Sequence, residues 1–471
     1  MTAARPLLIG VDVGTTRIKA GLVGVDGREL GQASVPTRWQ RRATGGEARP
    51  ADFLQSVRQV LAELVATAPH GEIAGLGVTS MAETAILLDR DGQAIGPSVA
   101  WFDRRAAADY AQMAAEFPAG ETGLAPGEIP TVATLRWLRR EDPGLSRAVR
   151  ALTVAEWVVY GLGGSAAAEP SLASRTGALS IARREWWPEV LRWAGLPATL
   201  FPALQAAGTS WGRVRDPTGG LDRLAGAALT VAGHDHIVAS VGSGVTHSHQ
   251  ATDSCGTAEA LIRPVAVDSA PDPAAGIADG VCTSWHVLPG HYCLLVGLRL
   301  GIELSALLEQ LGAPATHGRT ELDGAALRIL DGAPATPGTA PAGRWLAALR
   351  AAVDRSERAL RTLETLGGQL TEVRVSGGWA ANPVLQRLKA RAFPHPVYPD
   401  VAEAGIRGAA LLAGLAAGVY PSPGGFPPPP LGAAPGLPGP RPAPPTPRAP
   451  GHTARTSPHP ETDQQDRTAT P

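Results

Sequence analysis

A strand that breaks at a turn of small residues and then resumes as a second strand occurs twice in this sequence, and this repeat constrains the fold most. The first copy runs through Leu7–Val13, breaks at Gly14–Thr16 and resumes over Ile18–Val23. The second copy lies within Gln250–Arg263. Short apolar runs rich in β-branched residues are typical of strands and too short for helices. The repeat therefore predicts two domains of similar plan, with a boundary near Gly244.

Helical and strand periodicity accounts for most of the remaining chain before the C-terminal region. Apolar residues at helical spacing predict helices, and short β-branched runs predict strands. The expected helices are Phe53–Ala66, Val238–Gly244, Trp345–Leu366 and Ala402–Gly418, and the region Thr131–Leu204 is expected to be mostly helical. The expected strands are Ile73–Thr79, Ala85–Leu88, Leu229–Ala232 and Val373–Ser376.

The composition changes abruptly at Pro421. From there to the end, Pro, Gly, Ala and Thr dominate and large apolar residues are almost absent. Such a segment cannot bury enough surface to offset its ordering entropy, so residues 421–471 are expected to be disordered. Two interpretations of this tail stay open: a proline-rich ligand for a partner, or filler that reflects codon bias.

Composition and charge exclude several classes of function. The 471 residues carry a formal net charge of -1, which gives no indication of a nucleic-acid partner. No leader pattern and no uninterrupted apolar stretch of membrane-spanning length is present, so we expect a cytoplasmic protein without a membrane partner. The three cysteines lack metal-ligand spacing and are interpreted as reduced thiols.

Lysine is nearly absent, since Lys19 and Lys389 are the only two. A phosphate-binding P-loop requires a Gly-Lys pair, which does not occur, and the His-Arg-Asp and Asp-Phe-Gly motifs of protein kinases are missing as well. If this chain handles phosphate, it must therefore use backbone amides, hydroxyls, arginine and a metal ion.

Two acidic motifs carry candidate chemistry. Asp12-Val13-Gly14-Thr15-Thr16 follows the first strand, where a glycine turn presents amides and hydroxyls to an anion and a carboxylate can hold Mg²⁺. Gly233-His234-Asp235-His236-Ile237 lies between a predicted strand and a predicted helix. Asp235 is therefore interpreted either as a helix cap or as a base that takes a hydroxyl proton.

Two glycine motifs suggest the other half of a site. Gly256-Thr257 lies at the turn of the second strand pair and offers another amide and hydroxyl. Gly377-Gly378-Trp379-Ala380-Ala381-Asn382 follows a predicted strand, and its two glycines let a flat ligand lie close to the backbone. Each motif alone is also typical of an ordinary turn.

The four motifs in this order resemble the FGGY family of carbohydrate kinases, over about Leu7 to Tyr420. Two further stretches strengthen the resemblance: Gly77–Thr84 followed by Trp101-Phe102-Asp103-Arg104-Arg105, and Ala173-Ser174-Arg175-Thr176 ahead of Trp186. The resemblance implies an α/β, two-domain actin-like (ribonuclease H-like) ATPase fold with a cleft between the domains. It also implies phosphorylation of a ketose or polyol hydroxyl, with ATP and Mg²⁺ required.

The resemblance assigns roles to individual residues. Asp12 would lie near Mg²⁺, and Thr15 and Thr16 would face the γ-phosphate. Asp235 would be the base. The expected substrate contacts are Glu83, Asp103, Arg105 and His236, with Asp103 and Arg105 either contacting the sugar or shaping its pocket. The expected nucleotide contacts are Thr257, Gly301, Gly378 and Asn382.

The resemblance also sets expected domains: 1–244 with the sugar site and base, 245–420 with the nucleotide site, and 421–471 as the tail. Two departures from the family pattern are visible. Ala82 stands where glycerol kinases have an arginine, which argues against glycerol as substrate, and the chain looks short between Leu311 and Arg344. The shortening leaves a sugar or nucleotide sensor as the alternative to an enzyme. A dinucleotide-binding enzyme is disfavoured because no Gly-x-Gly-x-x-Gly opens a helix. The family suggests a homodimer.

Overall fold

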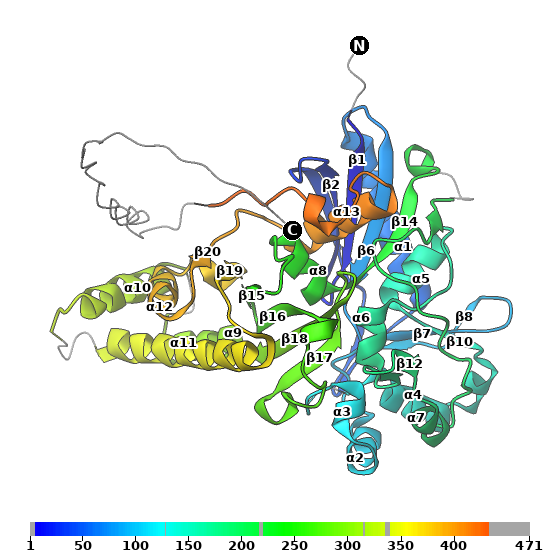
Figure 1. Cartoon of the computed structure of the whole chain (residues 1–471), viewed down its shortest axis with the longest axis horizontal. Helices are drawn as coiled ribbons and strands as arrows, with labels where there is room; N and C mark the ends of the chain where they lie inside the picture. Colours follow the sequence, from blue (N-terminus) through cyan, green and yellow to red (C-terminus); the bar gives the residue numbers. More distant parts are fainter. Residues whose placement is uncertain (1–4, 128, 216–219, 314–315, 335–339, 433–471) are drawn as a thin grey trace, which may run out of the picture. The chain divides into compact units, whose positions relative to one another are not determined.

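The structure, a computed structural model, describes residues 5–127, 129–215, 220–313, 316–334 and 340–432. Two six-stranded sheets dominate these residues (Figure 1). The first has the order β13-β14-β6-β1-β2-β3 and the second the order β17-β18-β16-β15-β19-β20. The strands of the first sheet are β1 (Leu7–Val13), β2 (Arg17–Gly24), β3 (Glu29–Pro36), β6 (Ile73–Ser80), β13 (Gly212–Arg213) and β14 (Ala228–His234). Those of the second are β15 (Gln250–Cys255), β16 (Glu259–Ala266), β17 (Val281–Trp285), β18 (His291–Leu298), β19 (Glu372–Ser376) and β20 (Pro396–Val397).

Both sheets are built around the same unit, which confirms the repeat seen in the sequence. In the first sheet, β1 pairs antiparallel with β2 and parallel with β6, and β6 pairs parallel with β14. In the second, β15 pairs antiparallel with β16 and parallel with β19, and β19 pairs parallel with β20. An antiparallel hairpin extended by parallel strands therefore forms the centre of each domain, as expected for a two-domain actin-like fold.

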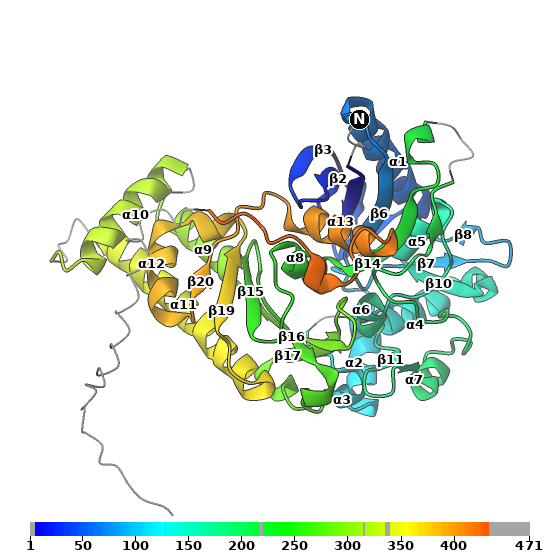
Figure 2. The same cartoon turned by 45° about the horizontal axis from the view of Figure 1, so that its top comes forward.

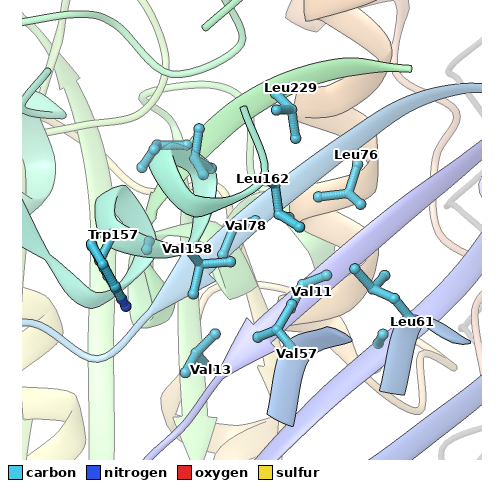
Figure 3. Packing of buried hydrophobic residues seen from close by; sticks show 14 of the residues in the cluster. Val11, Val13, Val57, Leu61, Leu76, Val78, Trp157, Val158, Leu162 and Leu229 are labelled. Carbon is cyan, nitrogen blue, oxygen red and sulfur yellow. The ribbon is translucent and has the colours of Figure 1, made fainter. Parts of the chain in front are cut away.

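Apolar side chains pack the first sheet against two helices, α1 (Pro50–Thr67) and α5 (Val154–Gly161). Figure 3 shows the contact at close range. The residues in it alternate along the strands, because successive strand side chains point to opposite faces. They are Val11 and Val13 of β1, Leu76 and Val78 of β6, Leu229 of β14, Val57 and Leu61 of α1, and Trp157 and Val158 of α5, with Leu162 beside them.

The opposite face of the first sheet carries α13 (Ala404–Ala416), which crosses it beside α8 (Asp235–Gly242) (Figure 2). Glycines allow this close approach. A Cβ at Gly10 would lie 1.9 Å from the carbonyl oxygen of Ile406, and one at Gly77 would lie 2.2 Å from that of Ala409. Between the two helices, a Cβ at Gly408 would lie 2.1 Å from the carbonyl oxygen of Val238. A side chain at these glycines would push α13 off the sheet or away from α8.

Helix α13 falls within the expected domain 245–420 and contacts the first sheet. The last predicted helix packs on the first sheet, because the glycines that receive it lie in β1 and β6. The chain therefore crosses from the second sheet back to the first after β20. The expected boundary near Gly244 stays a prediction.

Four helices accompany the second sheet: α9 (Leu300–Gln310), α10 (Thr316–Leu330), α11 (Ala340–Gly367) and α12 (Pro383–Ala392). The long α11 buries Trp345, Leu349 and Leu363 against the strands. Around these residues the second sheet has its own apolar core within the described part of the chain. The shortening expected between Leu311 and Arg344 therefore leaves the sheet intact.

The region Thr131–Leu204 is less helical than expected. It contains four helices, α4 (Thr131–Glu141), α5, α6 (Pro170–Ala173) and α7 (Pro188–Trp193), and strands interrupt them. Glycine and proline punctuate this region and shorten its helices. The remaining small strands of the described residues are β4 (Gln40–Arg42), β5 (Gly45–Ala48), β7 (Ala85–Leu88), β8 (Ala94–Ile95), β9 (Ser98–Val99), β10 (Arg150–Thr153), β11 (Leu179–Ser180) and β12 (Glu185–Trp186), and the remaining short helices are α2 (Ala107–Glu116) and α3 (Ala119–Thr122).

The start of the proline-rich segment, Pro421–Gly432, packs on both halves of the molecule. Phe426 contacts Tyr420 edge-on, with ring centroids 5.5 Å apart, and Arg407 of α13 donates to the carbonyl of Pro427. Further along, Asp400 N–H donates to Pro430 O over 2.8 Å. The expectation that disorder begins at Pro421 is therefore wrong for these twelve residues, which pack through one aromatic ring and main-chain carbonyls. Residues 433–471 lie outside the described part of the chain. Among the described residues, no helix combines the length and apolarity needed to cross a membrane.

Candidate active site

A cavity of about 190 Å³ lies between the two sheets and collects most of the sequence motifs. Its first wall comes from the β1–β2 turn, the end of β6, the Trp101 loop, the segment after α6 and the β14–α8 turn. Its second wall comes from β16 and β18. The lining residues are Thr15, Met81, Ala82, Glu83, Trp101, Arg175, His234, Asp235, His236, Ala258, Glu259, Ala260, Leu295 and Gly297.

Asp235 enters this cavity because β14 turns sharply into α8. Gly233 has φ +115°, and a Cβ there would lie 2.4 Å from Val287, so the turn requires glycine. His234 occupies the cap position of α8, and Asp235 is the first helical residue. The carboxylate accepts the N–H of His236 over 2.7 Å at Oδ1, and His234 Nε2 lies 3.3 Å from the same oxygen. No described residue hydrogen-bonds to Oδ2.

Burial sets the protonation of this turn. It raises the pKa of Asp235, while His236 and Arg175 pull that pKa down. Burial also lowers the pKa of His234 well below its usual value, so its imidazole is neutral. A carboxyl with a raised pKa that lines a cavity suits a group that accepts a proton near neutral pH.

The β1–β2 turn places Thr15 on the cavity wall and fixes it there with two indoles. Trp101 Nε1 donates to Thr15 Oγ1 over 2.8 Å, and Trp39 Nε1 donates to the Thr15 carbonyl over 2.7 Å. Thr16 follows in the same turn and is exposed, outside the cavity lining. The turn thus holds one hydroxyl rigidly and leaves the next one free.

Asp12, at the end of β1, has an environment that fits a cation. Its Oδ1 is buried and accepts no hydrogen bond from the described residues. Burial, and next the charge of Asp235, raise the pKa of Asp12 to about 7. Lys19 faces Asp12 across the hairpin, but its ammonium pairs with Glu403 at 2.7 Å. A buried carboxylate oxygen without a partner is a favourable ligand for a hard divalent cation such as Mg²⁺.

Glu83 follows β6 and meets Arg175 in the cavity wall. Arg175 Nε donates to Glu83 Oε1 over 2.6 Å, although the two residues are 92 positions apart. Glu83 has φ +60°, a left-handed conformation that non-glycine residues adopt rarely and that clusters at functional sites. Glu83 is thus both paired and held in a costly conformation at the cavity.

Asp103 and Arg105 do not line the cavity. Asp103 accepts the N–H of Gly46 over 3.0 Å and the guanidinium of Arg105 over 2.8 Å, and Arg105 also pairs with Glu47 at 2.7 Å. These bonds brace the loop that presents Trp101, two residues earlier. Of the two roles expected for this pair, the geometry favours shaping the pocket over contact with the sugar.

The four residues expected to bind nucleotide lie together beside the second sheet. A Cβ at Gly301 would lie 2.8 Å from both the carbonyl oxygen of Thr257 and Trp379 Nε1, so α9, the β15–β16 turn and the Gly377–Asn382 turn are in contact. Gly378 is exposed to open space. Asn382 is fully buried, and its side chain caps α12 and donates to Asp323. Its side chain therefore serves the helix, and the expected contact to nucleotide stays a prediction.

Reasoning from sequence missed Arg175, Met81 and Glu259 as cavity residues. Arg175 stood within a recognised motif, but its partner is far away in sequence and no local pattern points to it. Glu259 lies two residues after Thr257, and this position was the available signal.

Comparison with known proteins identifies the family of this chain. The FGGY family of carbohydrate kinases, N-terminal domain, matches residues 7–242, and its C-terminal domain matches residues 319–417. Together these matches cover most of the chain, and the chain belongs to this family of enzymes.

Individual relatives are named for different activities. A glycerol kinase of Citrifermentans bemidjiense is 29% identical over 460 residues, covering 88% of this chain and 90% of that protein. An L-fuculokinase of Escherichia coli K12 is 26% identical, covering 88% of this chain and 94% of that protein. The crystal structure of a xylulose kinase from Rhodospirillum rubrum superimposes with a TM-score of 0.79 at 22% identity, covering 87% of this chain and 89% of that one. The last likeness confirms the two-domain fold.

Proposed function

We propose that this kinase transfers the γ-phosphoryl group of ATP to a hydroxyl of a ketose or polyol, with Asp235 as the base. The observation that carries the proposal is the shared cavity. Asp235, His236 and Glu83 stand on its first wall with Thr15, and residues 258–260, next to the Gly256-Thr257 turn, stand on the second. An acceptor, a base and a phosphate-binding turn must meet in one place for phosphoryl transfer.

In the proposed reaction, Asp235 takes the proton of the substrate hydroxyl as its oxygen attacks the γ-phosphorus. The bond from that phosphorus to the bridging oxygen breaks, and ADP leaves. Glu83 and His236 would accept and donate hydrogen bonds to the other substrate hydroxyls, and Thr15 and Thr257 would bind phosphate oxygens. Mg²⁺, held near Asp12, would neutralise phosphate charge when bound.

Closure of the two domains over the substrates would exclude water, the competing acceptor. The sensor alternative rested on the apparent shortening between Leu311 and Arg344. The intact second sheet, together with alignment over 90% of a glycerol kinase, does not favour it.

The test is ADP release with Mg²⁺ and ATP across a panel that contains glycerol, D-xylulose, L-fuculose and D-gluconate. We expect at least one acceptor to be phosphorylated. Asp235→Asn keeps the shape of the side chain and removes the base, so kcat should fall by roughly 10²–10⁴-fold. Asp222→Asn, in the exposed 3-10 turn before β14 and outside the cavity lining, is the control and should leave kcat unchanged. Full activity of Asp235→Asn would refute the role of the base.

A further inference from the structure

The buried segment Glu169–Thr176 is a motif that the proposed mechanism leaves without a task. It comprises α6 and the 3-10 turn Ser174–Thr176, and all of its residues are buried. Three of its side chains form hydrogen bonds with three other parts of the molecule: the β14–α8 turn, β17 and Glu83.

Ser171 forms a hydrogen bond with the β14–α8 turn, which carries Asp235. Its Oγ accepts the N–H of His234 over 2.9 Å and donates to Oε2 of Glu169. His234 is the cap residue of α8, so this bond fixes the backbone from which Asp235 projects.

Ser174 forms a hydrogen bond with the second sheet. Its Oγ donates to the Pro170 carbonyl over 2.7 Å and accepts the N–H of Trp285 over 3.0 Å. Trp285 ends β17, the edge strand of the second sheet, and Thr283 of the same strand donates to Gly123 O over 2.8 Å. An exposed edge has free N–H groups, and here two of them bind the first domain.

Arg175 binds the carboxylate of Glu83. Its side chain is 6% exposed, and its Nε donates to Glu83 Oε1 over 2.6 Å. No described residue hydrogen-bonds to Oε2 of Glu83. One oxygen of Glu83 is therefore occupied by the protein, and the other is available in the cavity. The guanidinium is a planar, rigid donor, which fixes the carboxylate plane better than a lysine could.

A buried arginine–glutamate pair often has a structural role alone, and such a pair is weak evidence for function. Two features separate this one from that case. Both side chains line the cavity, and Glu83 has a left-handed backbone conformation that costs free energy for a non-glycine residue. A pair needed only for packing would not require the strained conformation at the cavity wall.

We propose that Arg175 is a positioning residue that sets acceptor specificity by orienting Glu83. It leaves a single carboxylate oxygen to accept a substrate hydroxyl, and it does so from a segment anchored to the base turn and to the second domain. The inference rests on the proposed function, because it assumes that Glu83 receives an acceptor hydroxyl.

The test compares Arg175→Met, Arg175→Lys, Glu83→Gln and the double variant Arg175→Met/Glu83→Gln, using the best acceptor of the panel above. We expect Arg175→Met to raise the KM for the acceptor at least tenfold, with the KM for ATP changing less than twofold. Arg175→Lys should recover part of the loss. Since Arg175 acts through Glu83, the double variant should be no more than about threefold worse than Glu83→Gln alone.

Two controls separate positioning from stability. Arg140→Met removes another arginine–carboxylate pair outside the cavity, a more exposed one in which Arg140 of α4 lies 2.8 Å from buried Asp109 of α2, and should leave the acceptor KM unchanged. Guanidinium ions added to Arg175→Ala should restore acceptor affinity, because they refill the vacated site. Equal changes in both KM values, or additive effects in the double variant, would show a structural role and overturn the inference.

Failure of the proposed function has a different signature. If the wild-type protein phosphorylates no member of the panel, the proposed function fails. Acceptor binding in a thermal-shift titration then decides the inference: binding weakened at least tenfold by Arg175→Met upholds it, and binding that is unchanged or absent in the wild type refutes it.

Discussion

The two strand–turn–strand hairpins share a backbone plan and use their aspartates in opposite ways. Asp12, in β1, keeps a buried oxygen without a hydrogen bond while the neighbouring Lys19 pairs with Glu403. Asp253, in β15, pairs directly with Lys389, and both side chains are almost fully buried. Of the two lysines of the chain, Lys19 lies in β2 of the first hairpin, and Lys389 of α12 contacts the second hairpin. In the first hairpin, the carboxylate of Asp12 is available for chemistry. In the second hairpin, the carboxylate of Asp253 forms a structural ion pair with Lys389.

The second hairpin also gathers a larger buried network. Lys389 donates to Glu259 over 3.0 Å, and Ser356 donates to the same carboxylate over 2.8 Å. Burial raises the pKa of Glu259 to about 7, and that of Cys255 is raised as well. Asp253, Cys255 and Glu259 have the spacing of a metal site, but the lysine ammonium occupies their midst. The cluster is therefore an ion-pair core beneath the Gly256-Thr257 turn.

The largest predicted effect is that of Asp12→Asn, which tests the contrast between the two hairpins. If the first carboxylate serves chemistry, kcat should fall on the order of 10³-fold, since charge stabilisation in a dry site is lost. The thermal midpoint should stay the same or rise, because an unpaired buried carboxylate disappears. Measuring kcat and the melting temperature together tests both halves. A variant that is active but unstable would reverse the assignment of the two hairpins.

The next effect concerns the second hairpin. Lys389→Met leaves Asp253 and Glu259 buried without a counter-charge, and should lower the free energy of unfolding by about 3 kcal/mol. Urea unfolding measures this loss. Lys19→Met is the matched control, since its pair with Glu403 is partly exposed and should cost less than about 1 kcal/mol. Equal losses in the two variants would contradict the contrast between the hairpins.

The smallest effect is a pH dependence that belongs to the first hairpin alone. The pKa of Asp12, raised to about 7 by burial, means that a proton competes with Mg²⁺ below pH 7. The apparent KM for Mg²⁺ should therefore rise up to about tenfold per pH unit as the pH falls below 7, and level off above it. Titrations at pH 6, 7 and 8 measure the slope. It should vanish in Asp12→Asn and persist in Lys389→Met.

The hairpins could be predicted because their signals are local. The strand lengths, the glycine turn and the position of Asp235 at the start of a helix all follow from a few neighbouring residues. The pairing of Glu83 with Arg175 could not, because it joins segments 92 residues apart that meet only in the folded chain. The cap formed by Asn382 is local and could have been recognised, since an Asn before Pro383 is a frequent helix start.

The composition led to a wrong prediction of disorder for Pro421–Gly432, and the reason is physical. The entropy argument averages over the whole tail, so it cannot detect one aromatic ring and a few carbonyls that pack at its beginning. Likewise, no local pattern indicates that α13 packs on the first sheet, because its receiving glycines, in β1 and β6, lie more than three hundred residues earlier.

The packed segment Pro421–Gly432 has a practical consequence for anyone who handles this protein. Gly432 N–H donates to Tyr398 O over 3.0 Å, whereas Tyr420 OH donates to Val25 O over 2.9 Å. An affinity handle or fluorophore attached after Gly432 would therefore start beside the chain that leaves β20. The same handle attached after Tyr420 would start beside the β2–β3 turn and would delete the contacts to Arg407 and Asp400.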